Sequence, residues 1–179
     1  MTTTITPVEP EAATGVAKEL LAEVNKALGL VPNMTKVMAN SPALLKAYLA
    51  LSGAAAGGAL NAGIRERLAI ATAQLNGCEY CLSAHTFIGE NIAYVPAGEL
   101  AAARKAESDE AHVQALLELS NEIASNTGNV GEDALSKARA AGVTDEEIGE
   151  LVLNISLNVL TNYFNVLAGV ENDWPVVSL

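Results

Sequence analysis

The sequence predicts an all-α fold, a single-domain helical bundle of about eight helices. Half of the 179 residues are apolar and only 4% are aromatic, a composition that favours closely packed helices over an aromatic-rich β-sandwich. Apolar residues recur at the three- and four-residue spacing of amphipathic helices, and no segment alternates convincingly as a strand does. The length suffices for one domain with a sizeable core. We therefore expect residues 1–10 to form an extended tail and residues 11–179 to form one helical domain.

Three helix signals mark the first third of the chain. The first is an amphipathic stretch over residues 11–28, followed by Gly29 as a natural stop. The second is a short helix expected over residues 33–39. The third, residues 41–56, opens with an N-cap serine followed by proline at the first helical position. Residues 53–63 are rich in glycine and alanine but lack the Lys-Ser/Thr ending of a phosphate loop, so we expect a linker there.

The remaining helices are delimited by turn and capping signals. The Asn76-Gly77 pair is a turn signal between two helices, which we expect at residues 64–76 and 78–91. Thr144 and Glu147 have the spacing of a capping box and should open the last helix. The other expected helices in this part of the chain are a short one opening at Pro96 and longer ones at residues 109–126, 132–141 and 144–168.

Charge and hydropathy disfavour several classes of partner. The formal net charge of -11 and the absence of a Lys/Arg cluster disfavour nucleic acids and anionic membrane surfaces. Residues 1–10 lack the basic and apolar regions of a secretory signal. The most apolar stretch, residues 151–160, is interrupted by Asn154, Ser156 and Asn158 and is too short and polar to span a bilayer. We expect a cytoplasmic protein, in which cysteines more often serve redox, catalytic or metal-binding roles than structural ones.

The informative motif spans residues 66–85 and contains both cysteines of the chain. On a helix, Cys78, Cys81 and His85 fall within an arc of roughly 60°. Cys81 and His85 are four residues apart, so their side chains can touch. The turn at residues 76–77 should make the two flanking helices antiparallel, which brings Glu66 and His85 within about 3 Å of the same level. The spacing therefore predicts that a Glu–His–Cys relay can form.

These residue types suit thiol–disulfide redox chemistry. A thiolate is the nucleophile, and its pKa falls at a helix N-terminus and beside a protonated imidazole. A carboxylate such as Glu66 can hold the tautomer of His85, and a second cysteine can capture a sulfenic acid as a disulfide. We expect Cys78 to lie at an exposed helix start, where a reductant can reach it, and Cys81 to lie beside the imidazole.

Two less specific interpretations of the motif stay open. The same four residues could together bind a structural zinc ion, and the cysteines could be a buried, inert pair. The second histidine, His112, lies among polar residues and is expected to be solvated. A stripe of asparagines on the last helix is expected to be a polar face or a buried hydrogen-bonding seam rather than a site: Asn154, Asn158, Asn162 and Asn165.

The distribution of apolar residues in the last expected helix predicts a homo-oligomer. One of its sides is apolar through Leu153, Leu157, Leu160 and Phe164, and another through Val152, Ile155, Val159, Tyr163 and Val166. A helix that is apolar over so much of its girth is buried on more than one side. One small domain does not readily cover both sides, so we expect a neighbouring subunit to cover one of them.

The intervals between Glu66, Cys78, Cys81 and His85 resemble the motif of the alkylhydroperoxidase D (AhpD-like) and carboxymuconolactone decarboxylase superfamily. The segments at residues 30–33 and 41–48 resemble the part of the chain that precedes the motif in many members. The resemblance covers residues 28–95 well, and the C-terminal half matches only as helices of suitable length. It indicates the branch with two cysteines, because the decarboxylases lack the pair.

The resemblance implies an all-α AhpD-like fold, a trimer or hexamer and antioxidant peroxidase activity. Carried over, Cys81 attacks the hydroperoxide, Cys78 resolves the intermediate, and His85 and Glu66 form the proton relay. Tyr80 stands where the namesake enzyme has a histidine between the cysteines, and a phenol is a poor base at neutral pH. We expect a hydroperoxide substrate, a thiol or dithiol reductant, and neither cofactor nor metal. The alternatives are a disulfide oxidoreductase or electron carrier that serves a protein partner, and a helical module with a structural metal.

Overall fold

The computed structural model describes residues 4–179, and the prediction of an all-α fold is confirmed. Within these residues there are no strands, and nine helices are present where about eight were predicted. The helices are α1 (Gly15–Leu28), α2 (Asn33–Met38), α3 (Pro42–Ala56), α4 (Ala62–Asn76), α5 (Glu79–Asn91), α6 (Ala97–Ala103), α7 (Ala111–Ser125), α8 (Glu132–Ala140) and α9 (Asp145–Ala168).

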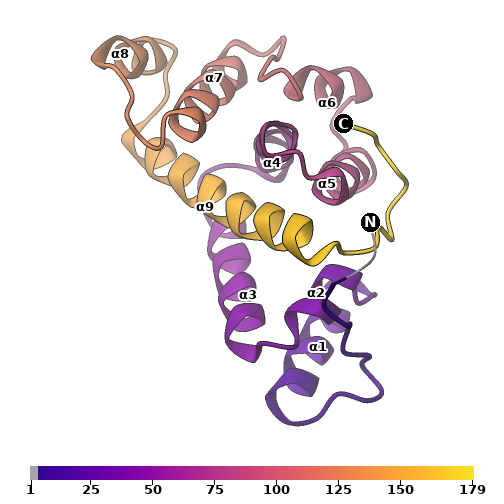
Figure 1. Ribbon diagram of the computed structural model, residues 1–179. Helices are drawn as coiled ribbons and strands as arrows, with labels where there is room; N and C mark the ends of the chain where they lie inside the picture. The colour runs from indigo at the N-terminus through magenta and orange to yellow at the C-terminus, as the bar shows by residue number, and fades with distance from the viewer. Residues whose placement is uncertain (1–3) are drawn as a thin grey trace.

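The long helix α9 crosses the middle of the molecule and organises the other helices (Figure 1). It packs against α3 on one side and against α4, α5 and α7 on the other. Helices α1 and α2 lie at the end of α3, and α6 to α8 form the opposite part of the fold. Helix α4 contributes to two apolar clusters, one with α1, α2 and α5 and one with α7 and α9. It is therefore a central support for any site on its surface.

Several predicted boundaries shift by a few residues, and two of the shifts have a clear local physical reason. Helix α1 begins at Gly15 rather than at residue 11, because Thr14 is extended, with φ -130° and ψ 162°, and Gly15 has a left-handed φ of 54°, so the helix cannot continue toward residue 11. The expected linker at residues 53–63 shrinks to residues 57–61. At its end the Asn61 side chain caps α4 by accepting a hydrogen bond from the Ile64 amide at 3.0 Å.

Helix α9 begins as predicted but buries an unexpected side. Both bonds of the capping box between Thr144 and Glu147 are present. The buried face in the single chain is the asparagine stripe, whereas the residues of both apolar sides are half-buried or exposed. Asn154 and Asn158 donate their side-chain amides to carbonyls one turn earlier on the same helix, so these polar groups can be buried without a partner from elsewhere. The stripe is thus a buried seam, one of the two outcomes expected for it.

Helix α9 extends well beyond the apolar stretch at residues 151–160. Among the described residues it is the one helix with the length and apolar composition to cross a membrane. The central helix of a compact fold meets the same criteria, and α9 packs against α3, α4, α5 and α7. These contacts make α9 the central helix of the described fold.

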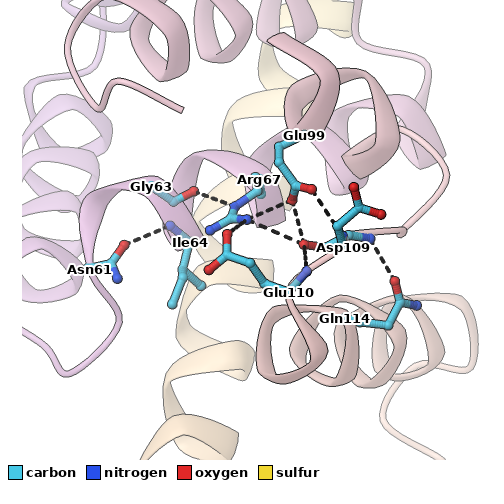
Figure 2. Close-up of polar contacts among 9 residues, drawn as sticks. Asn61, Gly63, Ile64, Arg67, Glu99, Asp109, Glu110 and Gln114 are labelled. Atoms are coloured by element: carbon cyan, nitrogen blue, oxygen red, sulfur yellow. Dashed lines mark hydrogen bonds and ion pairs between the residues drawn. The ribbon is translucent and has the colours of Figure 1, made fainter. Parts of the chain in front are cut away.

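A charged network ties α4 to α6 and α7 (Figure 2). The nearly buried Arg67 guanidinium contacts the Glu99 carboxylate at 2.9 Å and the Glu110 carboxylate at 2.6 Å. Hydrogen bonds from the Ser108 hydroxyl and the Asp109 amide, together with Arg67, lower the pKa of Glu99. Because Arg67 follows the motif residue Glu66 on the same helix, this network fixes the helix from which Glu66 projects.

Candidate active site

The turn between α4 and α5 sets the position of both cysteines. Gly77 ends α4 with a φ of 66°, a conformation that costs glycine little. Cys78 follows as the N-cap of α5, and its sulfur lies 3.2 Å from the backbone nitrogen of Cys81. The Cys78 amide donates in turn to the Ala73 carbonyl at 3.0 Å. The cysteine pair is therefore held at a helix start by the backbone of both helices.

Cys78 and Cys81 are joined by a disulfide, with 5.3 Å between their Cα atoms. Both are buried, with exposed fractions of 1% and 2%. The expectation that Cys78 lies exposed for a reductant is wrong. The physical reason is that the α4–α5 turn packs into the apolar cluster formed with α1 and α2, so a position at a helix end is still an interior position.

Glu66 and His85 meet as the spacing predicted. The Nδ1 atom of His85 lies 2.7 Å from Oε2 of Glu66, and their side chains are 26% and 15% exposed. Gly89, one turn after His85, allows the close approach of the Leu100 side chain from α6. A Cβ atom there would lie 2.7 Å from the Leu100 side chain and 3.5 Å from the Cβ of Glu66. The carboxylate thus orients the imidazole and leaves its Nε2 atom for other partners.

A cavity of about 310 Å³ brings the motif residues together. Cys81, His85 and Glu66 all line it, whereas Cys78 is not among its described lining residues. The rest of the wall is largely apolar and includes Leu28, Leu30, Ile88, Leu157, Phe87 and Trp174. Its volume lies within the usual range for small-molecule sites. Of the two cysteines, Cys81 is the one that lines the cavity.

Tyr80 is part of the architecture of the site. Its hydroxyl donates to Oδ1 of Asp173 at 2.8 Å and accepts from the Met34 amide at 3.3 Å. Burial first, and then the charge of Asp173, raise the pKa of Tyr80 far above its ordinary value. The phenol therefore stays protonated and connects the C-terminal tail, which runs along α5 in Figure 1, to α2 and α5.

Two further side chains belong to the site and were missed from the sequence. The Asn165 side-chain nitrogen lies 3.3 Å from the sulfur of Cys81, so one member of the asparagine seam reaches the cysteine pair. Tyr48 also lines the cavity, and its pKa is raised by burial and by the negative charge of Glu66. The four-residue spacing of polar side chains on an apolar helix was the available signal for Asn165, and nothing local marked Tyr48.

The second histidine lies outside this site and is not simply solvated. His112 binds Glu147 through Nε2 at 2.8 Å and the Ala141 carbonyl through Nδ1 at 3.3 Å. Within residues 4–179, no group of three or more His, Cys, Asp and Glu side chains is arranged to hold a metal ion.

Comparisons with known proteins give a family match over part of the chain and a shared fold over nearly all of it. Residues 42–120 match the model of the carboxymuconolactone decarboxylase family. Among solved structures, an uncharacterised peroxidase-related protein from Ralstonia eutropha JMP134, described as an alkylhydroperoxidase AhpD core, has a TM-score of 0.83 at 24% identity. The similarity covers 95% of this chain and 92% of that one. No curated protein sequence matches.

Two more structures share the fold at lower identity. A peroxidase-related protein from Silicibacter sp. TM1040 has a TM-score of 0.80 at 19% identity and covers 96% of this chain and 92% of its own. The debrominase Bmp8, solved in complex with 2,3,4-tribromopyrrole, has the same score and identity and covers 97% and 93%. Residues 42–120 are thus similar to the carboxymuconolactone decarboxylase family, and the described chain has the fold of the AhpD-like structures.

Proposed function

We propose that this protein is a thiol peroxidase that reduces hydroperoxides through a dithiol/disulfide cycle of Cys78 and Cys81. The observation that carries the proposal is the arrangement of the cavity wall. Cys81, His85 and Glu66 share it, and His85 contacts Glu66, while Cys78 is bonded to Cys81 and is not among the described lining residues. A substrate in the cavity would meet Cys81 first, which supports Cys81 as the attacking residue.

The proposed cycle has three balanced steps. The Cys81 thiolate attacks the hydroperoxide and breaks the O–O bond, which yields a sulfenic acid on Cys81 and, after one proton is taken up, an alcohol. The Cys78 thiol then attacks the sulfenic sulfur, forms the disulfide and releases water. Two reducing equivalents from an external thiol or dithiol regenerate the two cysteines.

His85 and Glu66 would move the proton that this chemistry needs. Because Glu66 occupies Nδ1 of His85 at 2.7 Å, the Nε2 atom can give a proton to the departing alkoxide oxygen. A protonated imidazole also stabilises the thiolate of a cysteine one helical turn away. Glu66 then acts through His85 by fixing its tautomer and compensating its charge.

The cavity favours organic hydroperoxides over hydrogen peroxide. Its wall is mostly aliphatic and aromatic, and the Phe87 and Trp174 rings pack with their centroids 5.6 Å apart. Burial of an apolar substituent against such a wall adds binding free energy that hydrogen peroxide cannot obtain. We therefore expect a compact organic hydroperoxide such as cumene hydroperoxide to be preferred.

Burial of both sulfurs also bears on the reductant. A thiol has to enter the cavity and attack Cys81, so that Cys78 departs as the leaving thiol. A small or extended thiol can do this more readily than the surface of a folded protein. This favours the peroxidase over the alternative of a disulfide carrier that serves a protein partner. The cytoplasm, which supplies such thiols, is the expected location.

A second candidate activity is the reductive removal of halogen from an aromatic ring. It is favoured by the combination of an apolar, aromatic-lined cavity and a cysteine on its wall, together with the similarity of fold to a debrominase that binds a brominated pyrrole. Here the dithiol would supply two electrons. Halide would leave, a proton would take its place on the ring, and the same disulfide would form.

We also propose that the protein works as a homo-oligomer, as a trimer or hexamer if it follows its superfamily. In the single chain the apolar residues Val152, Tyr163 and Val166 of α9 are exposed, and Leu167 beside them is 75% exposed. An exposed apolar side on a central helix is typical of a surface that a second copy covers. Light scattering at micromolar concentration tests this, and a monomeric mass would refute it.

A peroxide titration of the reduced protein tests the proposed function. One equivalent of cumene hydroperoxide should remove both thiols and give an intramolecular disulfide, identified by mass. Disulfide formation with 2,3,4-tribromopyrrole but not with hydroperoxide would favour the second candidate. Two free thiols after treatment, or mainly intermolecular dimers, would contradict a dithiol/disulfide cycle.

A further inference from the structure

The side-chain amide of Asn165 lies between two sulfur atoms inside the protein. Its Nδ2 atom is 3.3 Å from Sγ of Cys81 and 3.3 Å from Sδ of Met34. The residue is 3% exposed, and it projects from α9 toward α2 and α5. Three helices therefore enclose this one amide beside the sulfur that faces the cavity.

In the disulfide form this amide is poorly satisfied. Thioether and disulfide sulfurs are weak hydrogen-bond acceptors. The other end of the amide, Oδ1, is buried and has no hydrogen-bond partner in the described part of the chain. A buried polar atom without a partner is destabilising, and it calls for an explanation beyond packing. A leucine side chain of similar size would fill the same volume without burying an unpaired polar atom.

We propose that Asn165 stabilises the thiolate of Cys81 by donating a hydrogen bond from Nδ2 to the reduced sulfur. When the disulfide is reduced, two electrons enter, the S–S bond breaks, Cys78 takes a proton and Cys81 keeps a negative charge. A charged sulfur is a far stronger acceptor than a disulfide sulfur. The amide thus gains its good hydrogen bond only in the reduced, reactive state.

This inference deepens the proposed function, since it rests on Cys81 as the attacking residue. The amide donates from α9, whereas His85 acts from α5, so Cys81 has two independent sources of thiolate stabilisation. No corresponding contact joins Asn165 to Cys78 among the described residues. Asn165 therefore favours the thiolate at Cys81 over the thiolate at Cys78. The N-terminus of α5 cannot do this, because its N-cap is Cys78 itself.

The direct test is the pKa of the Cys81 thiol, measured by the pH dependence of iodoacetamide alkylation in a Cys78→Ser background. Asn165→Leu should raise this pKa by roughly one to two units, the value of a hydrogen bond to a charged group. When both cysteines are present, Asn165→Leu should make the Cys78–Cys81 disulfide harder to reduce. Equilibration with glutathione measures this as a lower reduction potential, by about 30 mV for each tenfold change in the equilibrium constant.

Asn162→Leu is the matched control. Asn162 belongs to the same buried seam and also has one buried amide atom, Nδ2, without a hydrogen-bond partner in the described chain. Its Oδ1 atom accepts from Asn76 at 3.0 Å, and its described hydrogen bonds include none to a sulfur atom. Asn162→Leu should lower the free energy of unfolding and leave the Cys81 pKa unchanged. Asn165→Ala provides a second variant should the leucine misfold, and it is expected to raise the pKa in the same direction.

Three results would overturn the inference. They are an unchanged Cys81 pKa in both Asn165 variants, an equal shift in Asn162→Leu, and a shift that appears at Cys78 in a Cys81→Ser background instead. Alkylation does not require peroxide. A protein that shows the Asn165 effect but consumes no hydroperoxide would therefore refute the proposed function and leave this inference standing.

Discussion

Two pairs of histidine and glutamate in this molecule have nearly the same bond but different surroundings. His85 and Glu66 are 2.7 Å apart, and His112 and Glu147 are 2.8 Å apart. The first pair lines a cavity beside Cys81. The second lies where α7 meets the start of α9, and the imidazole of His112 is 40% exposed.

The two pairs differ in whether the histidine keeps a ring nitrogen that is not hydrogen-bonded within the described chain. Both ring nitrogens of His112 are engaged, one by Glu147 and the other by the Ala141 carbonyl. Glu147 also completes the capping box of α9 with Thr144. In the described structure, the hydrogen bond of His85 involves Nδ1 alone. A carboxylate–imidazole pair is therefore suited to a relay only when one nitrogen remains for a substrate and a nucleophile stands beside it.

Substitution of the cysteines, which lie beside the His85–Glu66 pair and not beside His112–Glu147, should have the largest effect on activity. Cys81→Ser should abolish turnover of cumene hydroperoxide, because no other sulfur lines the cavity wall with His85 except that of Met34, a thioether. Cys78→Ser should allow one oxidation that stops at a sulfenic acid on Cys81. Dimedone labelling followed by mass analysis measures both outcomes. A sulfenic acid in Cys81→Ser, with none in Cys78→Ser, would reverse the two roles.

Removal of the imidazole should have the next largest effect. His85→Ala should slow oxidation by hydroperoxide roughly 10²- to 10⁴-fold, the usual contribution of a general acid or base. It should also raise the pKa of the Cys81 thiol. Stopped-flow rates across the pH range measure both, with His112→Ala as the matched control that should keep the parent rate. An unchanged pH profile in His85→Ala would mean that the relay is wrong.

Glu66→Gln should have a smaller effect in the same direction, because Glu66 acts through His85. We expect a loss of about tenfold in the rate with hydroperoxide, the lower end of the range for removing the carboxylate partner of a metal-bound histidine. In a His85→Ala background the same substitution should add little, because the two residues then no longer act as a unit. Additive losses in the double variant would show that Glu66 acts independently of His85.

The smallest effect concerns the second pair and appears in stability alone. Hydrogen bonds to Glu147 and the Ala141 carbonyl raise the pKa of His112 above its ordinary value. Protonated His112 thus stabilises the fold below that ordinary value, about 6.5, and the stabilisation is lost as the pH rises through the raised pKa. Because the imidazole is well exposed, its contribution should stay below about 1 kcal/mol.

Urea unfolding of His112→Ala and the parent measures this contribution. The difference in the free energy of unfolding should be larger at about pH 6 than at about pH 9. A difference that grows toward high pH would contradict the pairing of His112 with Glu147.

The sequence predicted best those features that short-range signals determine. Gly77 ends α4, Thr144 and Glu147 cap α9, and the length of the α4–α5 turn brought Glu66 level with His85. All of these depend on residues within about 20 positions of one another, where helix geometry is enough to place side chains.

Features that depend on packing between distant segments were missed or wrong. The burial of Cys78 follows from α1 and α2, which precede it by some 40 residues or more. The contact of Asn165 with Cys81 spans 84 positions, and that of Asp173 with Tyr80 spans 93. Helical periodicity predicts on which side of a helix a residue lies, but not which distant segment packs against that side. The burial of Cys78 and the contacts of Asn165 and Tyr80 depend on that packing.

The most direct test of the account is the second-order rate constant for oxidation of the reduced protein by cumene hydroperoxide. We predict a rate constant at least about 100-fold above that of free cysteine, retained in His112→Ala and lost in His85→Ala and Cys81→Ser. A rate constant equal to that of free cysteine, or one unaffected by His85→Ala, would contradict the claim that Cys81 and the His85–Glu66 pair form a peroxidase site.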